Sequence, residues 1–288
     1  MDLLPDAMVM RKPFSTSPAR GMQRTSLAAA CSFWLLGLIV LAADSVTGQN
    51  NISSEARGAA LALQLRTQKP TEPLATSGFL RQRNPDGKWR PRVPLQFEVR
   101  IVGDSWQSIY RALGADDKPI EILMVTHHES RPNVYEYWRV GVSGSGNADR
   151  VALQGDAAAI PFAGSEFWLS DLGLEFLHWP GQNLIGGQMR KGRACHILES
   201  INPSPGMNAY SRVRSWVDVE HCGILRAEAY DQNKRLVKEF NIGSFKKVSG
   251  KWQLKSIEIR NARTDALTRI EFDLEIEDKP QQQQDKAD

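Results

Sequence analysis

The sequence is poor in the side chains that usually carry out chemistry. It has five histidines and three cysteines in 288 residues. The one adjacent pair, His127 and His128, is poorly placed to chelate an ion, because neighbours on a strand point to opposite faces. A Gly-x-Ser-x-Gly nucleophile elbow is missing, and the nearest string, at 163–166, reads AGSE. We therefore expect no catalytic residue, no metal site, no cofactor and no enzyme activity.

Neither sign of charge dominates the composition. The chain has 36 lysines and arginines against 33 aspartates and glutamates, a formal net charge of +3. A nucleic-acid-binding domain normally shows a basic patch and a much higher pI, so we expect no nucleic-acid partner. The glycine-rich stretch 141–149 lacks the lysine and the strand–helix context of a phosphate-binding loop.

Long hydrophobic runs are also scarce, with one exception near the N-terminus. Arg20 and Arg24 precede LAAACSFWLLGLIVLAA, at 27–43, and small residues follow. This order predicts a secretory signal peptide over 1–48, compatible with an alternative start at Met22. Since the run has about 17 residues, the lower limit for a membrane span, an uncleaved anchor is the alternative. Cys31 lies too close to Arg24 to be a lipidation site.

Two cysteines, Cys195 and Cys222, follow the signal. An oxidising compartment permits a disulfide between them. Cys195 opens one predicted strand and Cys222 lies in a turn two strands later, so antiparallel pairing could bring them together. The sequence leaves a disulfide and two free thiols equally open, because it does not show the geometry.

An alternation of period two predicts most of the secondary structure. Every second residue from Val93 to Ile101 is apolar, as in a half-buried strand. The turn sequence NPDG, at 84–87, predicts a hairpin between 77–83 and 88–102. By the same signals, further strands are predicted at 105–113, 120–127, 133–142, 193–200, 211–218, 223–230, 235–247, 251–263 and 266–277.

Two short segments have helical spacing instead. Ser53 or Ser54 could cap a helix that ends near Leu65. The very apolar segment FWLSDLGLEFLHW, at 167–179, predicts one or two helical turns that end at Pro180. A loosely held apolar helix over a sheet can act as a lid. The predicted lid residues are Phe167, Trp168, Leu172, Phe176 and Trp179.

These elements predict a mainly β protein of about eleven strands. No strand–helix–strand pattern appears and the connections are short, so neighbouring strands should be antiparallel. The strands have one apolar face, which a sheet of this size must cover by curling, by sandwiching or with helices. We expect a single domain over 49–278 and a disordered tail at 279–288, where the composition is polar.

Several strings occur in a characteristic order. The C-terminal half reads CHILES, YSRVRSWVDVE, GILRAEAYDQNKRLVKEF and FKKVSGKWQLKSIEIRNARTDALTRIEFD between Cys195 and Asp273. Upstream lie FAGSEFWLSDLGLEFLHWP, and VPLQFEV with WQSIY. Together they resemble the outer-membrane lipoprotein-sorting proteins of the LolA-like superfamily, over about 200 residues of the mature chain.

This resemblance implies a half-open antiparallel β-barrel with short helices covering its open mouth. It implies a periplasmic, monomeric carrier that shields the acyl chains of lipoproteins or other lipids and meets transport proteins of the inner or outer membrane. The alternative is an envelope lipid sensor or scaffold that uses the same barrel without transport. The expected cavity lining is Phe97, Val99, Trp106, Trp138, Phe272 and Leu274.

Overall fold

The computed structural model describes residues 53–140, 150–207, 209–248 and 251–273. The predicted signal at 1–48, the tail at 279–288 and Leu274 lie outside these ranges. The helical elements are α1 (Ser54–Arg66), η1 (Gly155–Ala158), η2 (Phe162–Gly164), α2 (Leu169–Leu172) and η3 (Glu175–His178). Among the described residues, no helix has the length and apolar character needed to cross a membrane.

A 13-stranded sheet, antiparallel at every pairing, makes up most of the structure. Its strands are β1 (Leu74–Arg83), β2 (Val93–Val102), β3 (Ser105–Leu113), β4 (Pro119–His127), β5 (Val134–Arg139), β6 (Val151–Leu153), β7 (Gly181–Arg190), β8 (Arg193–Ile201), β9 (Arg212–Asp218), β10 (Ile224–Tyr230), β11 (Leu236–Val248), β12 (Lys251–Asn261) and β13 (Leu267–Phe272). They follow the order β6-β5-β4-β3-β2-β1-β13-β12-β11-β10-β9-β8-β7, so the sheet is open, with β6 and β7 at its edges.

The predicted mainly β, half-open antiparallel architecture is confirmed, but the predicted number of about eleven strands is too low. The two unpredicted strands are the two edges. β6 has only three residues, and β7 reads GQNLIGGQMR, whose three glycines interrupt the apolar alternation. An edge strand pairs on one side only, which allows it to form without a strong pattern of its own.

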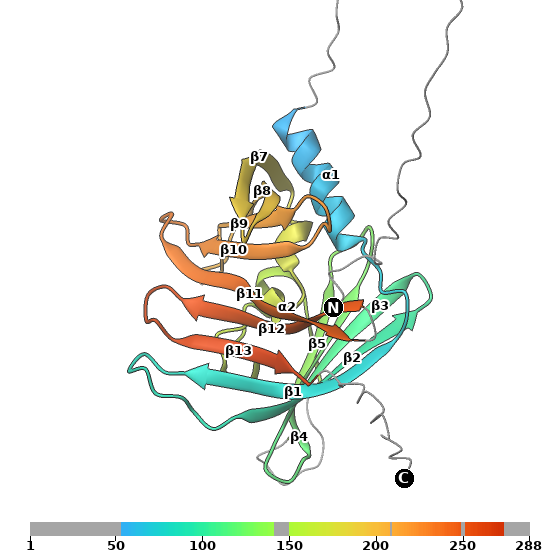
Figure 1. The fold of residues 1–288 in the computed structure, drawn as a ribbon, viewed down its shortest axis with the longest axis vertical. Coiled ribbons are helices and arrows are strands. Elements are labelled where there is room, and N and C mark those ends of the chain that lie inside the picture. The colour runs from blue at the N-terminus through green and yellow to red at the C-terminus, as the bar shows by residue number, and fades with distance from the viewer. Residues whose placement is uncertain (1–52, 141–149, 208, 249–250, 274–288) are drawn as a thin grey trace, which may run out of the picture. The chain divides into compact units, whose positions relative to one another are not determined.

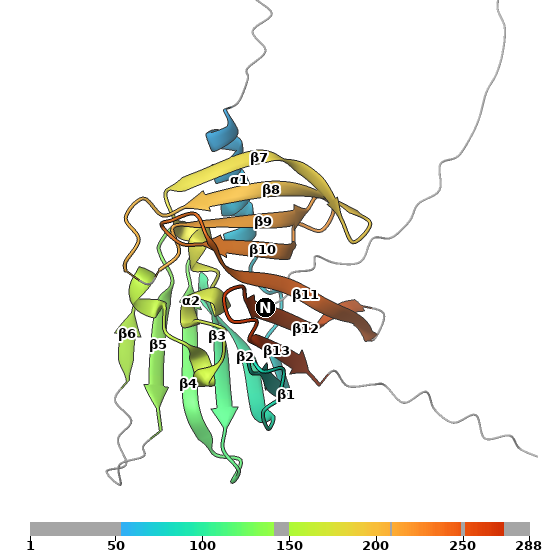
Figure 2. The same ribbon diagram turned by 90° about the vertical axis from the view of Figure 1, so that its left-hand side faces the viewer.

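The sheet curls around its inner face. Figures 1 and 2 show β2–β6 running across the direction of β7–β13, with the segment around α2 inside the curve. β1 joins the two halves, pairing with β2 on one side and β13 on the other. Gly78 lies where a Cβ atom would meet the Glu271 carbonyl oxygen at 2.1 Å, so only glycine fits this close approach of β1 to β13.

Two clusters of buried side chains fill the inner face. The first core cluster contains Leu80, Phe97, Tyr110, Leu123 and Ile270 and extends over β1–β5 and β11–β13. The second core cluster lies beneath β8–β10. It contains Leu198, Val213, Ala227 and Ala229, together with Ala62 and Leu65 of α1. Residues of 160–180 enter both clusters, which places this segment at the centre of the molecule's packing.

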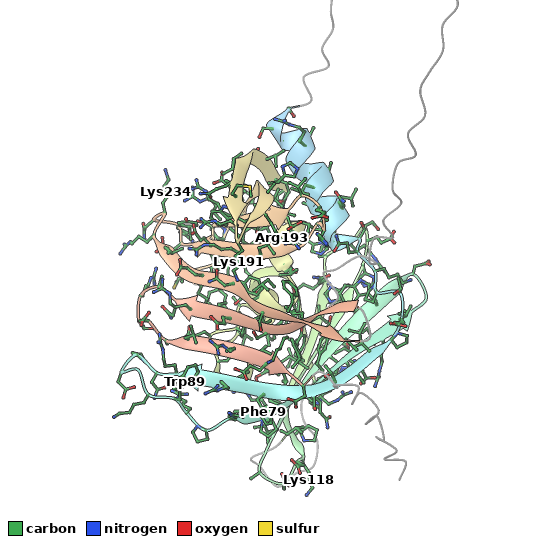
Figure 3. All side chains as sticks on the ribbon, viewed as in Figure 1. Phe79, Trp89, Lys118, Lys191, Arg193 and Lys234 are labelled. Atoms are coloured by element: carbon green, nitrogen blue, oxygen red, sulfur yellow. The ribbon has the colours of Figure 1, made fainter. Side chains whose placement is uncertain are left out.

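The outer face carries the charges that alternation puts opposite the core. Cross-strand ion pairs join Arg226 to Glu239 and Arg269 to Glu258. The Arg81 guanidinium lies over the Trp89 ring at 4.6 Å, and Figure 3 shows Trp89 beside β1. Ion pairs of this kind on a solvated face contribute little to stability individually, but they keep the strand register.

Helix α1 packs against the edge strand β7. The Ser53 side chain caps it by accepting a hydrogen bond from the Ala56 N–H at 3.0 Å, as the sequence predicted. Gly58 faces the strand so closely that an added Cβ would lie 2.6 Å from the Asn183 backbone. The helix therefore covers part of an edge whose backbone groups would otherwise be open to pairing.

Candidate functional site

The segment 160–180, called here the lid segment, lies within the curve of the sheet (Figure 2). It forms η2, α2 and η3 instead of one continuous helix. The break falls at Gly173 and Leu174, where Leu174 has a left-handed φ of 52°. Asp171 caps α2 by accepting a hydrogen bond from the Trp168 N–H at 2.8 Å.

Polar side chains on the inner face of the sheet bind the backbone of the lid segment. On one side, Gln82 donates to the Ala163 carbonyl at 3.0 Å and Glu121 accepts from the Ala163 N–H at 2.5 Å. On the other side, Gln182 donates to the carbonyls of Phe176 and Trp179, each at 2.9 Å. Each of these buried polar groups thus finds its partner in the lid segment.

A buried lysine provides a further tether. Lys238 of β11 is 3% exposed. Its Nζ donates to the Glu166 carbonyl at 2.6 Å and lies 3.4 Å from a carboxylate oxygen of Asp171. The same ammonium lies 3.6 Å from the centre of the Trp168 ring, which stacks on Tyr210. Burial lowers the pKa of Lys238, and the Asp171 carboxylate opposes that shift.

A second tether joins β5 to the middle of the lid segment. The Tyr135 hydroxyl donates to Glu175 at 2.9 Å, and the Asn133 amide donates to the Gly173 carbonyl at 2.7 Å. Glu175 is buried without a cationic partner among its hydrogen bonds, and this burial raises its pKa to about 7.

A small cavity lies between the lid segment and β9–β12. Its volume is about 30 Å³, room for about one water molecule. Three polar side chains line it: Asp171, Tyr210 and Lys238. The remaining lining is apolar: Leu174, Phe176, Val213, Ile224, Ala227, Ala229, Phe240 and Ile259. Ligand pockets usually exceed about 300 Å³, so the lining side chains leave too little space for a lipid in this structure.

The cavity residues predicted from sequence lie elsewhere. Phe97, Val99 and Phe272 are buried in the first core cluster, and Phe97 contacts the Phe272 ring at 5.5 Å. Trp106 packs against the same cluster and stacks on His127 at 3.6 Å. Trp138 lies on the opposite, outer face of the sheet, beneath the Arg150 guanidinium. None of these five residues lines the observed cavity, and Leu274 lies outside the described residues.

The predicted lid residues do lie together over the inner face, but they are packed firmly. Phe167 and Leu172 enter the first core cluster. Phe176 belongs to the second, against which Trp168 and Trp179 pack with partial exposure. Only Phe176 of these lines the 30 Å³ cavity. The expectation of a loosely held helix is thus wrong in this structure, because buried apolar and polar contacts both hold the segment.

The two cysteines are free thiols on different sides of the sheet. Cys195 packs with Trp216 and Leu225 in a small outer cluster. Cys222 belongs to the second core cluster. Burial raises the pKa of both thiols, which makes them poor nucleophiles at neutral pH. Of the two alternatives left open by the sequence, the structure contains the unbridged one.

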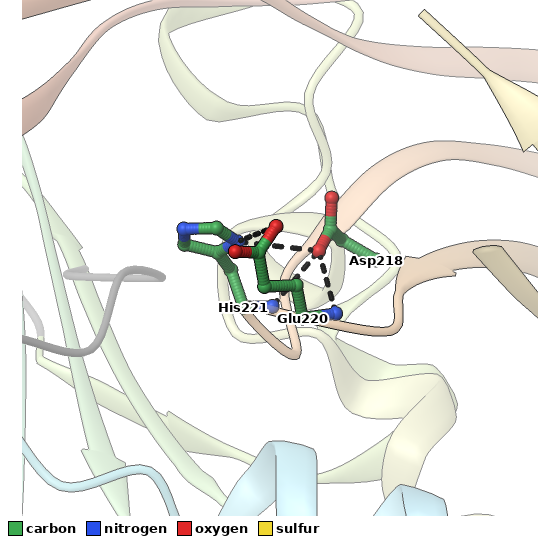
Figure 4. A group of neighbouring side chains, drawn as sticks. All are labelled: Asp218, Glu220 and His221. Carbon is green, nitrogen blue, oxygen red and sulfur yellow. Dashed lines mark hydrogen bonds and ion pairs between the residues drawn. The ribbon is translucent and has the colours of Figure 1, made fainter. Parts of the chain in front are cut away.

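One group of metal-capable side chains comes together within the described ranges, in the turn between β9 and β10. Asp218, Glu220 and His221 place ligand atoms within 4.8 Å of one another (Figure 4). A cation already lies among them, because Arg193 Nη1 is 3.1 Å from Asp218 and 2.9 Å from His221 Nδ1. Asp218 also accepts the backbone N–H groups of Glu220 and His221. The group is a turn stabilised by an arginine.

Sequence reasoning missed the polar residues that tether the lid segment. A signal was present for two of them, because Lys238 and Glu121 occupy positions on the apolar faces of their strands. Lys238 lies on the same face of β11 as Phe240 and Ile242, and Glu121 lies on the same face of β4 as Leu123. A polar residue on the apolar face of a strand therefore marked a buried contact, although not its partner.

Comparison with known proteins gives a family match and several structural likenesses. The model of a family described as "Uncharacterized protein" matches residues 115–283, more than half of the chain. A search of curated proteins finds no match. A DUF1329 family protein from Desulfovibrio piger is 18% identical, with a TM-score of 0.63, over 77% of this chain and 92% of its own.

Two further solved structures share the fold. A putative outer membrane lipoprotein-sorting protein domain from Vibrio parahaemolyticus is 18% identical, with a TM-score of 0.59, over 76% of this chain and 91% of its own. A LolA superfamily protein from Nitrosomonas europaea is 16% identical, with a TM-score of 0.52, over 77% and 95%. At these identities the likeness establishes the fold.

Proposed function

Because the chain belongs to the family whose model matches residues 115–283, and has the fold of the LolA-like superfamily of lipoprotein-sorting proteins, we propose that it is a lipid carrier. In this proposal the inner face of the sheet shields acyl chains of lipoproteins or other lipids. The lid segment closes the site when it is empty. The proposal includes no catalytic step, and no residue is assigned a catalytic role.

The observation that carries the proposal is a mostly apolar cavity covered on one side by the lid segment. Eight of the eleven side chains around the cavity are apolar. The lid segment contributes Asp171, Leu174 and Phe176 to that lining. Displacing it would join the cavity to the space that the segment now fills. Burying an acyl chain there would contribute roughly 0.8 kcal/mol per CH₂, which would work against the loss of the lid contacts.

The predicted signal peptide and the fold support a more specific role, the transport of acylated proteins across the periplasm. Export would place the protein in the periplasm, where acylated proteins must cross water between two membranes. One structure with the same fold is named as a lipoprotein-sorting protein domain. We propose that the chain works there as a monomer, receiving its cargo from one membrane protein and delivering it to another.

A second candidate function is an envelope lipid sensor or scaffold that does not transport. The observation that favours it is the small size of the cavity, about 30 Å³, because the chain's own side chains fill the remaining space. A sensor would use the lid segment as a switch and keep its ligand only briefly. The two candidates differ in whether lipid stays bound through purification.

The first test is native mass spectrometry, with lipid extraction, of the mature protein purified from the periplasm. A co-purifying acylated species is the result expected of a carrier. A clean apo mass, together with no uptake of added lipid or lipopeptide, would overturn the carrier and favour the sensor or scaffold.

The double substitution Leu172→Asp with Phe176→Asp tests the role of the lid segment. We expect it to abolish lipid uptake, measured by the same mass spectrometry, because two carboxylates would line the path of the chain. Circular dichroism checks that the sheet stays folded. Undiminished uptake by a folded double variant would contradict the lid.

A milder change keeps this test decisive if the double variant does not fold. Asn133→Ala removes the hydrogen bond to the Gly173 carbonyl without adding charge. It should speed lipid uptake, because the closed lid loses a buried hydrogen bond worth about 1 kcal/mol. An unchanged uptake rate would count against movement of the lid.

A further inference from the structure

The observed cavity carries a single cation in an apolar lining. Lys238 is the one positively charged side chain among the described residues that line it, and Asp171 is the one negatively charged side chain. The two form a pair at 3.4 Å, and Tyr210 donates to the same oxygen of Asp171 at 3.3 Å. If the lid segment moves to make room, an apolar lining with one cation suits a molecule with a long apolar chain and one anionic end.

The two partners of this ion pair belong to parts of the molecule that would separate on opening. Lys238 lies on β11, within the sheet, whereas Asp171 lies in α2. The Glu166 carbonyl and the Trp168 ring also contact Lys238, and both belong to the lid segment. Movement of the segment would therefore remove three partners of Lys238 together, leaving the Tyr210 ring at 5.6 Å.

A buried ammonium that loses its counter-ion is strongly unfavourable, by several kcal/mol in proteins. An open state filled by a neutral chain would carry this cost. A ligand with a carboxylate head would remove it by taking the position that Asp171 holds in the closed state. The released Asp171 carboxylate would then move with the lid segment toward water, where it is well solvated.

We propose that the preferred ligand is a long-chain carboxylate whose head group replaces Asp171 at Lys238. Its hydrocarbon chain lies along the apolar lining between β9 and β12. This inference rests on the proposed lipid-binding function and names the class of lipid. It makes Lys238 a specificity-determining residue and Asp171 an internal competitor of the ligand.

The test compares oleate, oleyl alcohol and oleylamine, which share one chain and differ in the charge of the head. Binding to the full mature protein is measured by isothermal titration calorimetry, below the concentrations at which the ligands form micelles. We expect oleate to bind at least about tenfold more tightly than the alcohol, since a charge-assisted hydrogen bond contributes 1.5 kcal/mol or more. Oleylamine should bind most weakly.

Substitutions then assign the preference to its residues. Lys238→Met should abolish the tenfold preference and tighten the binding of oleyl alcohol, because the open state no longer holds an unpaired ammonium, whereas Lys238→Arg should keep the preference. Asp171→Asn should raise the affinity for oleate and for oleyl alcohol, because the state without ligand loses its ion pair, and it should keep the preference for oleate. Lys118→Met removes an exposed charge in the turn between β3 and β4 (Figure 3) and is the matched control.

The possible outcomes distinguish failure of the carboxylate preference from failure of the proposed lipid-binding function. Equal affinities for oleate and oleyl alcohol in the wild-type protein, a measurement that needs no variant, would overturn the carboxylate preference and leave lipid binding intact. A preference that survives in folded Lys238→Met would overturn the assignment to Lys238. If no ligand binds, both the preference and the proposed function fail.

Discussion

At the scale of single residues, Glu175 shows how position changes the chemistry of an ordinary side chain. It is 6% exposed, and its hydrogen bond comes from the neutral hydroxyl of Tyr135. Burial therefore dominates and raises its pKa from 4.5 to about 7. Lys238 is equally buried, yet it has the Asp171 carboxylate beside it. The contacts of the lid segment thus include the Lys238–Asp171 ion pair and a hydrogen bond to Glu175, a group with a raised pKa.

Glu175 should make stability depend on pH. Because its folded-state pKa is raised, its contribution is complete below about pH 4.5 and is lost as the pH rises to about 7. Glu175→Gln removes this dependence. Relative to the wild type, the variant should gain up to roughly 3 kcal/mol in free energy of unfolding between pH 4 and pH 8. Urea denaturation at each pH measures it.

The matched control is Glu129→Gln, which changes an exposed carboxylate. The stability difference between this variant and the wild type should stay nearly constant over the same range. If Glu175→Gln behaves in the same way as Glu129→Gln, Glu175 is not titrating in a buried site.

At the scale of elements, the lid segment depends on a close contact between Gly173 and β5. A Cβ atom at Gly173 would lie 2.3 Å from the hydroxyl oxygen of Tyr135, which is fully buried and cannot easily move. Glycine here is required by packing, since the residue has an ordinary φ of −98°. The break between α2 and η3 thus lets the chain approach the sheet.

Gly173→Ala should loosen the lid segment although alanine favours helices. We expect a loss of about 1–3 kcal/mol in the free energy of unfolding, because the added methyl group overpacks a filled core. Hydrogen exchange of 169–179 should become faster. Gly206→Ala is the control, since its Cβ would meet no atom closer than 3.5 Å. Equal stability of the two variants would contradict the tight contact.

At the scale of the whole molecule, one segment joins the two core clusters. The lid segment contributes Phe162 and Leu169 to the first cluster and Phe176 and Leu177 to the second. Phe240 of β11 also packs against both. The sheet itself runs without interruption from β6 to β7. The two core clusters therefore share contacts through the lid segment and Phe240, and either cluster would lose these contacts if the other unfolded. This is expected of a single folding unit.

The described domain should unfold in one cooperative transition. Leu123→Ala in the first cluster and Leu198→Ala in the second should each lower the free energy of unfolding by about 2–5 kcal/mol. Both should shift the same transition when tryptophan fluorescence and circular dichroism are followed in urea. Leu63→Ala on the exposed side of α1 should change stability by less than about 0.5 kcal/mol. Two separated transitions would show that the clusters are independent.

The sequence by itself determined the local structure and the class of fold. Strict alternation in β2 and β13 and the turn before β2 predicted strands with one apolar face, and Ser53 or Ser54 predicted the start of α1. These signals act between near neighbours, so they can be read without knowing the tertiary structure. The resemblance to lipoprotein-sorting proteins then indicated the half-open barrel and the position of the lid segment.

Only the tertiary structure decided where the cavity lies and what closes it. The strand carrying Trp138 has aromatic residues on both faces, so alternation could not say which face turns inward. Nothing local pairs Lys238 with Asp171, which lies 67 residues away, or Glu175 with Tyr135. Such contacts depend on how far a 13-stranded sheet curls. That curvature is the sum of many small twists and close approaches, such as the one at Gly78, and no single stretch of sequence contains it.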